Sequence, residues 1–223
     1  MDWIAALDDA TGRFAAVLEE GDLSARVPAC PDWSLADLGE HLRGVHAWAA
    51  HAVTEGNPEG QPPPGPLDRD GLVAGYRAAA AHLVEVLAAT EPDAPAWAFG
   101  PEKVAGFWRR RQVHETTMHL LDALASQDRA SEWRVDPGLA WDGVEEVVTV
   151  FYPRQVRLGR TEPLAGTLRL VAEDVDTAPV ELGAGEPVAT ISGRAAYVLE
   201  ALWKRATVGD PVAAGLLEAA ITP

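Results

Sequence analysis

The stretch QVHETTMHLLD, residues 112–122, decides the fold expected for this chain and the chemistry it can support. Its residue pattern predicts one long helix over about residues 104–126. Glu115 and His119 lie four residues apart, so a helix places this carboxylate and imidazole about 40° apart on one face. Asp122 follows His119 by three residues, where it can accept a hydrogen bond and fix the imidazole tautomer. The stretch therefore predicts a helix that carries a pair of metal-ligating side chains.

The same stretch excludes one familiar zinc motif. In His-Glu-x-x-His proteases the two histidines lie four residues apart on one helix face. Here His114 and His119 are five residues apart, about 140° around the helix, so they cannot bind one ion from one face. The spacing favours Glu115 as a ligand rather than as the general base of a protease.

A second segment, WSLADLGEHL at residues 33–42, predicts another helix with a histidine. Ser34 is a suitable N-cap for a helix running to about residue 54, and Asp37 makes an imperfect capping box with it. The histidines of this helix are spaced by five residues and fan round the cylinder: His41, His46 and His51. At most two of them can point inward. Two helices that offer histidine, glutamate and histidine to a shared interior can build an open metal site.

Hydrophobic periodicity divides the chain into a helical part and a mixed part. Helices are expected over residues 3–20, 34–54, 68–90, 104–126 and 139–157. Strands are expected over residues 167–173, 179–182 and 188–191, followed by helices over 194–208 and 211–220. The predicted class is α+β, with a helical domain over residues 1–158 and a small α+β domain over residues 159–223.

Composition narrows the classes of function. The net charge is −16 over 223 residues, which argues against binding a nucleic-acid backbone. No apolar run reaches the roughly 18 residues that cross a bilayer, and the first residues lack the basic segment of a signal peptide. A single cysteine cannot form an internal disulfide, so we expect a cytoplasmic protein. The basic cluster at residues 109–111 is interpreted as a solvated helix face, or as an attractor for an anionic substrate.

Two sequence blocks resemble a known family. The segment VPACPDWS at residues 27–34, followed by Asp37 and His41, resembles the N-terminal signature of the mycothiol-dependent maleylpyruvate isomerase family, within the DinB-like metal-binding group. The segment RQVHETTMHLLD at residues 111–122 resembles the second signature of that family, although members often have arginine or tryptophan where Leu120-Leu121 stand here. Residues 192–193 and 202–205 resemble its C-terminal domain.

The resemblance implies a fold and a set of site residues. The fold would be a DinB-like up-and-down four-helix bundle followed by a small α+β domain. His41, Glu115 and His119 would hold a divalent metal, typically Zn²⁺. Arg205 would reach the substrate and serve catalysis. Lys204 is an alternative cation, because the choice between these two neighbouring residues rests only on their position relative to the family pattern.

The resemblance also implies a reaction. Mycothiol would be a co-substrate whose thiolate is activated at zinc, for isomerisation of a small electrophile or for S-transfer to it. Two alternatives stay open at this point: a hydrolase that uses zinc-bound hydroxide on the same bundle, and a non-catalytic protein that binds a metal or a small molecule. A monomer and a homodimer are both compatible with the sequence.

Overall fold

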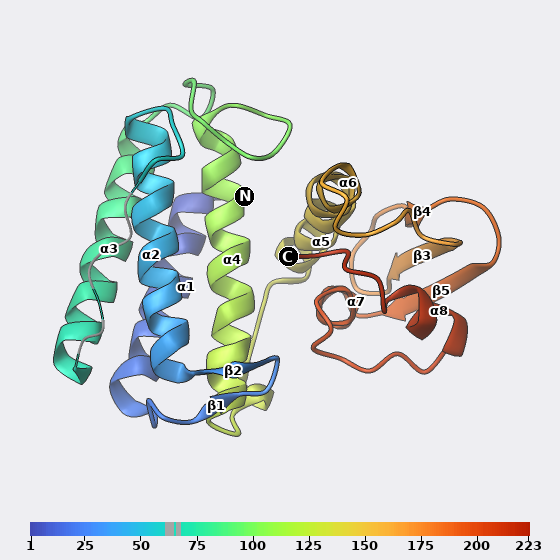
Figure 1. Cartoon of the computed structure of the whole chain (residues 1–223), viewed down its shortest axis with the longest axis horizontal. Helices are drawn as coiled ribbons and strands as arrows, with labels where there is room; N and C mark the ends of the chain where they lie inside the picture. The colour runs from blue at the N-terminus through green and yellow to red at the C-terminus, as the bar shows by residue number, and fades with distance from the viewer. Residues whose placement is uncertain (61–64, 66–67) are drawn as a thin grey trace. The chain divides into compact units, whose positions relative to one another are not determined.

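The computed structural model describes residues 1–60, 65 and 68–223. The chain divides into two compact units, Met1–Trp133 and Arg134–Pro223 (Figure 1). The long helices of the first unit are α1 (Trp3–Glu20), α2 (Leu35–Thr54), α3 (Arg69–Ala89) and α4 (Ala105–Ser126). Strands β1 (Arg26–Val27) and β2 (Cys30–Ser34) form an antiparallel pair between α1 and α2, and a 3-10 turn, η1 (Ala130–Glu132), follows α4.

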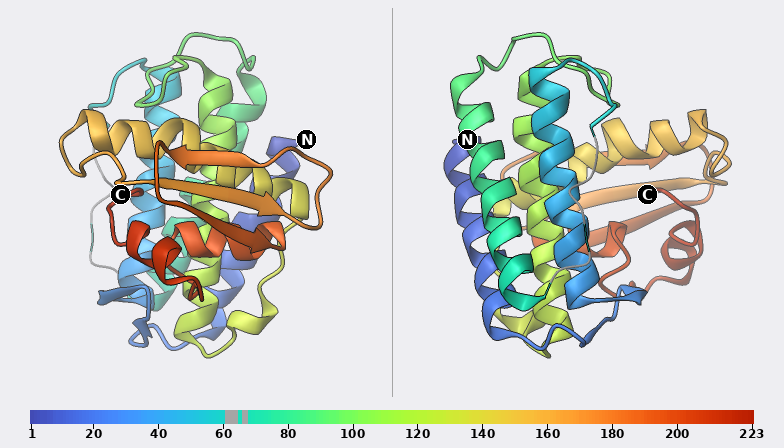
Figure 2. Two further views of the ribbon diagram at one scale, coloured as in Figure 1. Left: turned by 90° about the vertical axis from the view of Figure 1, so that its right-hand side faces the viewer. Right: turned by 60° about the vertical axis from the view of Figure 1, so that its left-hand side comes forward.

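The four long helices form a bundle in which α1 and α2 each pack against α3 and α4 (Figure 2). Arg69, at the start of α3, donates hydrogen bonds to carbonyls at the end of α1, including that of Leu18. Gln127, just after α4, hydrogen-bonds the backbone of Asp22, just after α1. The ends of α1 and α4 and the start of α3 therefore share one end of the bundle.

The helix directions refine the predicted up-and-down order. The chain reverses direction between α1 and α2 and again between α3 and α4, as predicted (Figure 1). However, α2 begins at the same end of the bundle as α3, since the Leu35 amide donates to the carbonyl of Ala25 in the segment that follows α1. Helices α2 and α3 consequently run in the same direction. The predicted α+β class, with a helical domain followed by a β-containing region, is confirmed, although the short β1–β2 pair lies within the helical unit.

Close helix contact in the bundle depends on small and apolar residues. Phe14 of α1 and Tyr76 of α3 are buried, and their ring centroids lie 4.9 Å apart. At Gly39 of α2, an added Cβ would lie 3.0 Å from Leu18 of α1 and 3.4 Å from Leu72 of α3. Burial of each large apolar side chain contributes about 1.5–3 kcal/mol. The glycine therefore allows three helices to converge near the start of α2.

Helix α3 is long and apolar enough to cross a membrane, by length and composition only, which the sequence had not indicated. Core helices of soluble proteins meet the same criterion. In the bundle, α3 buries one stripe of side chains against α1 and α2: Leu72, Tyr76, Leu83 and Leu87. Its other face is exposed and includes Arg77, which forms an ion pair with Glu19 of α1. The helix therefore has the amphipathic pattern of a bundle helix.

The second unit contains a three-stranded sheet with helices. Its helical elements are α5 (Pro137–Glu146), the π-helix η2 (Val147–Phe151), α6 (Tyr152–Arg157), α7 (Ala195–Leu202) and α8 (Pro211–Leu216). Its strands are β3 (Thr167–Ala172), β4 (Val180–Gly183) and β5 (Val188–Gly193). The strand order is β4-β3-β5, with β4 antiparallel and β5 parallel to β3 (Figure 2).

The chain divides before the helix predicted over residues 139–157, whereas the sequence predicted a division after it, at residues 158–159. The structure breaks this helix into α5, η2 and α6, and α5 packs on α7 of the second unit. Trp141 and Val144 of α5 and Leu199 of α7 are buried. Apolar surface on α5 is thus covered by a helix more than fifty residues later, which local periodicity does not reveal.

Candidate functional site

The start of α2 is held by a complete capping box. The Ser34 side chain accepts a hydrogen bond from the Asp37 amide, and the Asp37 carboxylate accepts one from the Ser34 amide at 2.8 Å. Hydrogen bonds from the Ser34 hydroxyl and amide lower the pKa of Asp37 below its usual value. The imperfect box predicted from sequence therefore forms, with aspartate in place of glutamate. It fixes the first turn of α2, one turn before His41.

The structure brings together the three predicted ligand residues from α2 and α4. His41 Nε2 lies 3.2 Å and His119 Nε2 lies 3.4 Å from the same oxygen, Glu115 Oε1. One ligand atom from each residue falls within 4.8 Å of the others. Ligand atoms about 2.1 Å from a tetrahedral zinc ion lie roughly 3.4 Å apart. The two distances to Glu115 Oε1 are close to this value.

Asp122 supports His119 as the sequence predicted. The carboxylate Oδ2 lies 3.0 Å from His119 Nδ1, and the Asp122 side chain is 1% exposed. Burial lowers the pKa of His119, but the hydrogen bonds to Asp122 and Glu115 outweigh it and raise the pKa to about 9. A hydrogen bond from Nδ1–H to Asp122 fixes the ring so that Nε2 faces Glu115; Nε2 can bind a metal once it has lost its proton, as a metal-ligating histidine must.

Arg111 is a site residue that sequence reasoning missed. The basic cluster was interpreted as a solvated face, but the Arg111 side chain is only 3% exposed and donates to Glu115 Oε2. Burial tends to raise the pKa of Glu115, whereas the Arg111 charge, followed by hydrogen bonds with the two histidines, holds that pKa well below its usual range. Glu115 is therefore a carboxylate ready to bind a cation. The four-residue spacing between Arg111 and Glu115 was the available signal.

The neighbouring Arg109 has a different, structural role. Its guanidinium donates to the carbonyls of Leu87 and Thr90, at 2.8 Å and 2.5 Å. These carbonyls lie at the C-terminal end of α3, where the helix dipole favours a positive charge. Arg109 thus joins α4 to the end of α3.

The remaining histidines lie away from the ligand set. His46 is fully buried, and its Nε2 lies 3.1 Å from the Thr116 hydroxyl. Because that hydroxyl donates to the Gln112 carbonyl, it accepts from His46. His51 bonds to the Asn57 side chain at 3.0 Å, and the His114 ring packs against Trp3. Of the three histidines on α2, His41 is the one that faces α4 at Glu115.

A hollow of about 350 Å³ lies beside His41 on α2. Its lining comprises Glu40, His41, Gly44, Val45, Trp48 and Gly60. The rings of Trp33 and His41 also pack together, with centroids 4.8 Å apart. One of the three candidate ligand residues, His41, therefore adjoins a space of the size that small-molecule pockets have, roughly 300–1,000 Å³.

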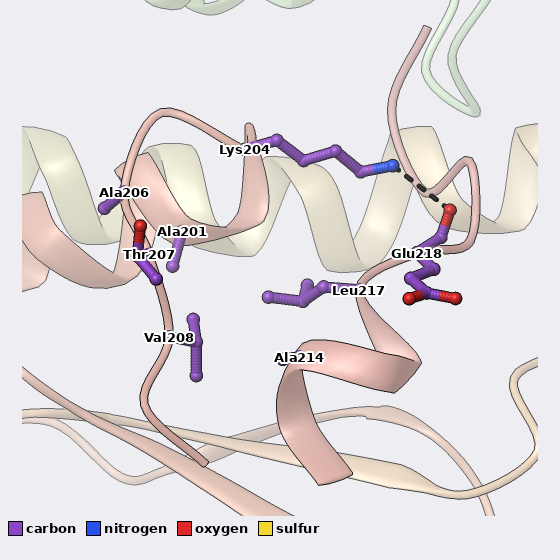
Figure 3. A pocket seen from close by; sticks show the side chains of 8 residues that line it. All are labelled: Ala201, Lys204, Ala206, Thr207, Val208, Ala214, Leu217 and Glu218. Carbon is purple, nitrogen blue, oxygen red and sulfur yellow. Dashed lines mark hydrogen bonds between the residues drawn. The ribbon is translucent and has the colours of Figure 1, made fainter. Parts of the chain in front are cut away.

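Arg205 and Lys204 lie just after α7 in the second unit. The Arg205 guanidinium donates to the Trp203 carbonyl at 2.5 Å and lies 5.8 Å from the centre of the Trp203 ring. Lys204 lines an open, mainly apolar hollow of about 430 Å³, and its Nζ donates to the Glu218 carbonyl at 3.2 Å (Figure 3). Lys204 has a φ of 61°, which ends α7 earlier than the predicted residue 208. The catalytic role of Arg205 stays a prediction.

Comparison with known proteins finds similarity to one family. A family model described as the mycothiol maleylpyruvate isomerase N-terminal domain matches residues 4–124. A crystal structure of the mycothiol-dependent maleylpyruvate isomerase has a similar fold, with a TM-score of 0.66, 14% identity, and coverage of 89% of this chain and 86% of that one. A histidine-to-alanine mutant structure has a TM-score of 0.65 with the same identity and coverage. No curated protein matches the chain by sequence. At this identity the structural likeness establishes the fold alone.

Proposed function

Because the chain belongs to the mycothiol maleylpyruvate isomerase N-terminal domain family, we propose that it is a metal- and thiol-dependent enzyme acting on a small electrophile. The thiol is mycothiol, and the reaction is isomerisation or S-transfer. The observation that carries this proposal is the meeting of His41, Glu115 and His119 within 4.8 Å at the interface of α2 and α4.

The donor set suits a catalytic zinc ion. Two imidazoles and one carboxylate are typical of catalytic zinc sites, in which three protein ligands leave a further position for water or substrate. Asp122 orients His119, and Arg111 keeps Glu115 ionised. The chemistry that a bound zinc ion supplies is stabilisation of a thiolate at neutral pH. The residues of this chain thus provide the ligands, their orientation and their charge.

In an isomerisation, the thiolate sulfur forms a bond to one carbon of a double bond conjugated to a carbonyl. The π electron pair moves to the carbonyl oxygen as an enolate, and the former double bond becomes free to rotate. Collapse of the enolate reforms the double bond and expels the thiolate unchanged. In S-transfer the carbon–sulfur bond persists and the enolate takes up a proton. We propose that the Arg205 guanidinium binds a substrate carboxylate and stabilises the enolate charge.

Metal analysis and turnover test this proposal together. Purified protein should carry about one equivalent of zinc, and it should convert a cis enone carboxylate to its trans isomer or to a mycothiol adduct only when mycothiol is present. His41→Ala and Glu115→Gln should lose both zinc and turnover. His51→Ala is the matched control, since His51 lies on the same helix but bonds to Asn57.

Three results would contradict the proposal. One is thiol-dependent turnover that survives His41→Ala and chelation. Another is the absence of metal binding in the wild-type protein. A third is efficient hydrolysis without any thiol, which would indicate the zinc-hydroxide alternative.

A further inference from the structure

The hollow beside His41 is formed by one face of α2. Glu40, Gly44 and Trp48 recur at four-residue spacing and line it along two turns of the helix. A Cβ added at Gly44 would meet no atom within 4 Å. Glycine inside a helix costs about 1 kcal/mol relative to alanine. The missing side chain therefore lowers helix stability, and it leaves open space beside a candidate ligand residue.

Trp48 provides a rigid aromatic wall. Its indole N–H donates to the Pro58 carbonyl at 3.0 Å. Its ring also packs against the rings of Trp108, at 5.0 Å, and Trp97, at 5.4 Å. A ring held from several sides loses little further entropy when a ligand packs on it. Such a flat, immobile apolar surface complements the C–H face of a sugar or cyclitol ring.

Glu40 adds a hydrogen-bond acceptor to the same wall. One carboxylate oxygen, Oε2, is bound by the Arg43 guanidinium. The other, Oε1, is shielded from solvent and has no hydrogen-bond partner among the described residues. A buried acceptor without a partner is destabilising, and a ligand hydroxyl that donated to it would supply the missing hydrogen bond. A carboxylate acceptor suits neutral polyols and disfavours a carboxylate-bearing electrophile.

We propose that this hollow binds the sugar–cyclitol portion of the thiol co-substrate, an inference that rests on the proposed function. Mycothiol carries its cysteine thiol on a glucosaminyl-inositol unit. His41 lines the hollow and belongs to the ligand set, so a thiol bound beside His41 has its polyol portion within reach of Trp48 and Glu40. These two residues then determine which low-molecular-weight thiol is accepted.

The test separates polyol binding from catalysis. The probe is N-acetylglucosaminyl-inositol, a neutral molecule without a thiol, titrated calorimetrically into zinc-loaded and zinc-free protein. Gly44→Leu fills the hollow without removing any contact of the fold. Gly12→Leu is the matched control, because Gly12 lies on α1 and its added Cβ would also meet nothing within 4 Å. We expect the wild-type protein and Gly12→Leu to bind the probe equally, and Gly44→Leu to bind it at least tenfold more weakly.

Kinetics give a second readout. Glu40→Gln and Trp48→Leu should raise the KM for mycothiol about tenfold, the factor that a lost contact of about 1.4 kcal/mol predicts. Their kcat should be unchanged, and so should their KM for N-acetylcysteine, which lacks the polyol.

The outcomes distinguish this inference from the proposed function. If zinc binds and mycothiol turns over, but the probe does not bind or binds Gly44→Leu as tightly as the wild type, the polyol site is overturned and the proposed function stands. If zinc or thiol turnover is absent while the probe binds and Gly44→Leu abolishes its binding, the proposed function fails and the polyol site stands. A probe that binds no form of the protein overturns the inference in either case.

Discussion

Replacing Asp122 with asparagine tests whether the carboxylate beneath His119 tunes the metal site. Asp122 Oδ2 lies 3.0 Å from His119 Nδ1, and the aspartate side chain is 1% exposed. Asparagine has nearly the same shape and can still accept the hydrogen bond through its amide oxygen. The substitution therefore removes the charge and leaves the packing largely intact.

The size of the effect follows from the kind of hydrogen bond that is lost. A hydrogen bond to a charged group contributes about 1.5–3 kcal/mol, whereas a neutral one contributes about 0.5–1.5 kcal/mol. The difference, about 1–1.5 kcal/mol, corresponds to zinc binding that is roughly tenfold weaker. Asp122→Ala should approach a loss of about 100-fold, the upper end for residues that orient a metal ligand.

Competition with a chromophoric zinc chelator at pH 7.5 measures the affinity. Asp128→Asn makes the same change of charge at an exposed residue just beyond α4, and its zinc affinity should equal that of the wild type. Circular dichroism and urea unfolding of the metal-free proteins establish that Asp122→Asn is folded. If folded Asp122→Asn binds zinc within twofold of the wild type, the reasoning about His119 orientation is refuted.

Three further predictions concern stability and catalysis. Burial lowers the pKa of His46 to about 4, so stability present above pH 6.5 should be lost as pH falls toward 4. In urea unfolding of the metal-free proteins, the free energy of unfolding lost between pH 6.5 and pH 4 should be about 3 kcal/mol smaller in His46→Gln than in the wild type. Equal losses in the two proteins would contradict this prediction. Ser34→Ala should lower the free energy of unfolding by about 1 kcal/mol at pH 7, and this difference should shrink as Asp37 is protonated below pH 3.8; an unchanged urea midpoint would argue against the capping box. Arg205→Ala should lower kcat roughly 100-fold with zinc content unchanged, and a comparable loss in Lys204→Ala alone would transfer the role to Lys204.

Much of the candidate site could be predicted from α4 alone. The Glu115, His119 and Asp122 arrangement follows from spacings of four and three residues within one helix. The contact between His119 and Asp122 at 3.0 Å is what helix geometry predicts for that spacing. Arg111 belongs to the same pattern, since it lies four residues before Glu115. It was assigned to solvent because a run of three arginines resembles an exposed face, and burial of one member depends on what covers it.

The domain division could not be predicted in the same way. Residues 139–157 have helical periodicity whichever unit they join, and the loop after Gly159 marks a change of composition rather than a change of core. The apolar face of α5 is covered by α7, far along the chain. The parallel run of α2 and α3 is equally invisible locally, because helix propensity carries no information about helix direction.

The sequence by itself determined the four long bundle helices, the cap at Ser34, the change from helical to mixed structure, and three side chains on one face of α4, since all of these follow from the 3.6-residue repeat and local hydrogen bonding. Helix spacing alone could not choose among His41, His46 and His51; the family resemblance pointed to His41, and the tertiary structure places it beside Glu115. Three histidines at five-residue spacing are equivalent until packing fixes the rotation of α2. In the rotation that α2 adopts, Gly39 lies against Leu18 and Leu72, His46 is buried beside Thr116 of α4, and His41 lies beside Glu115.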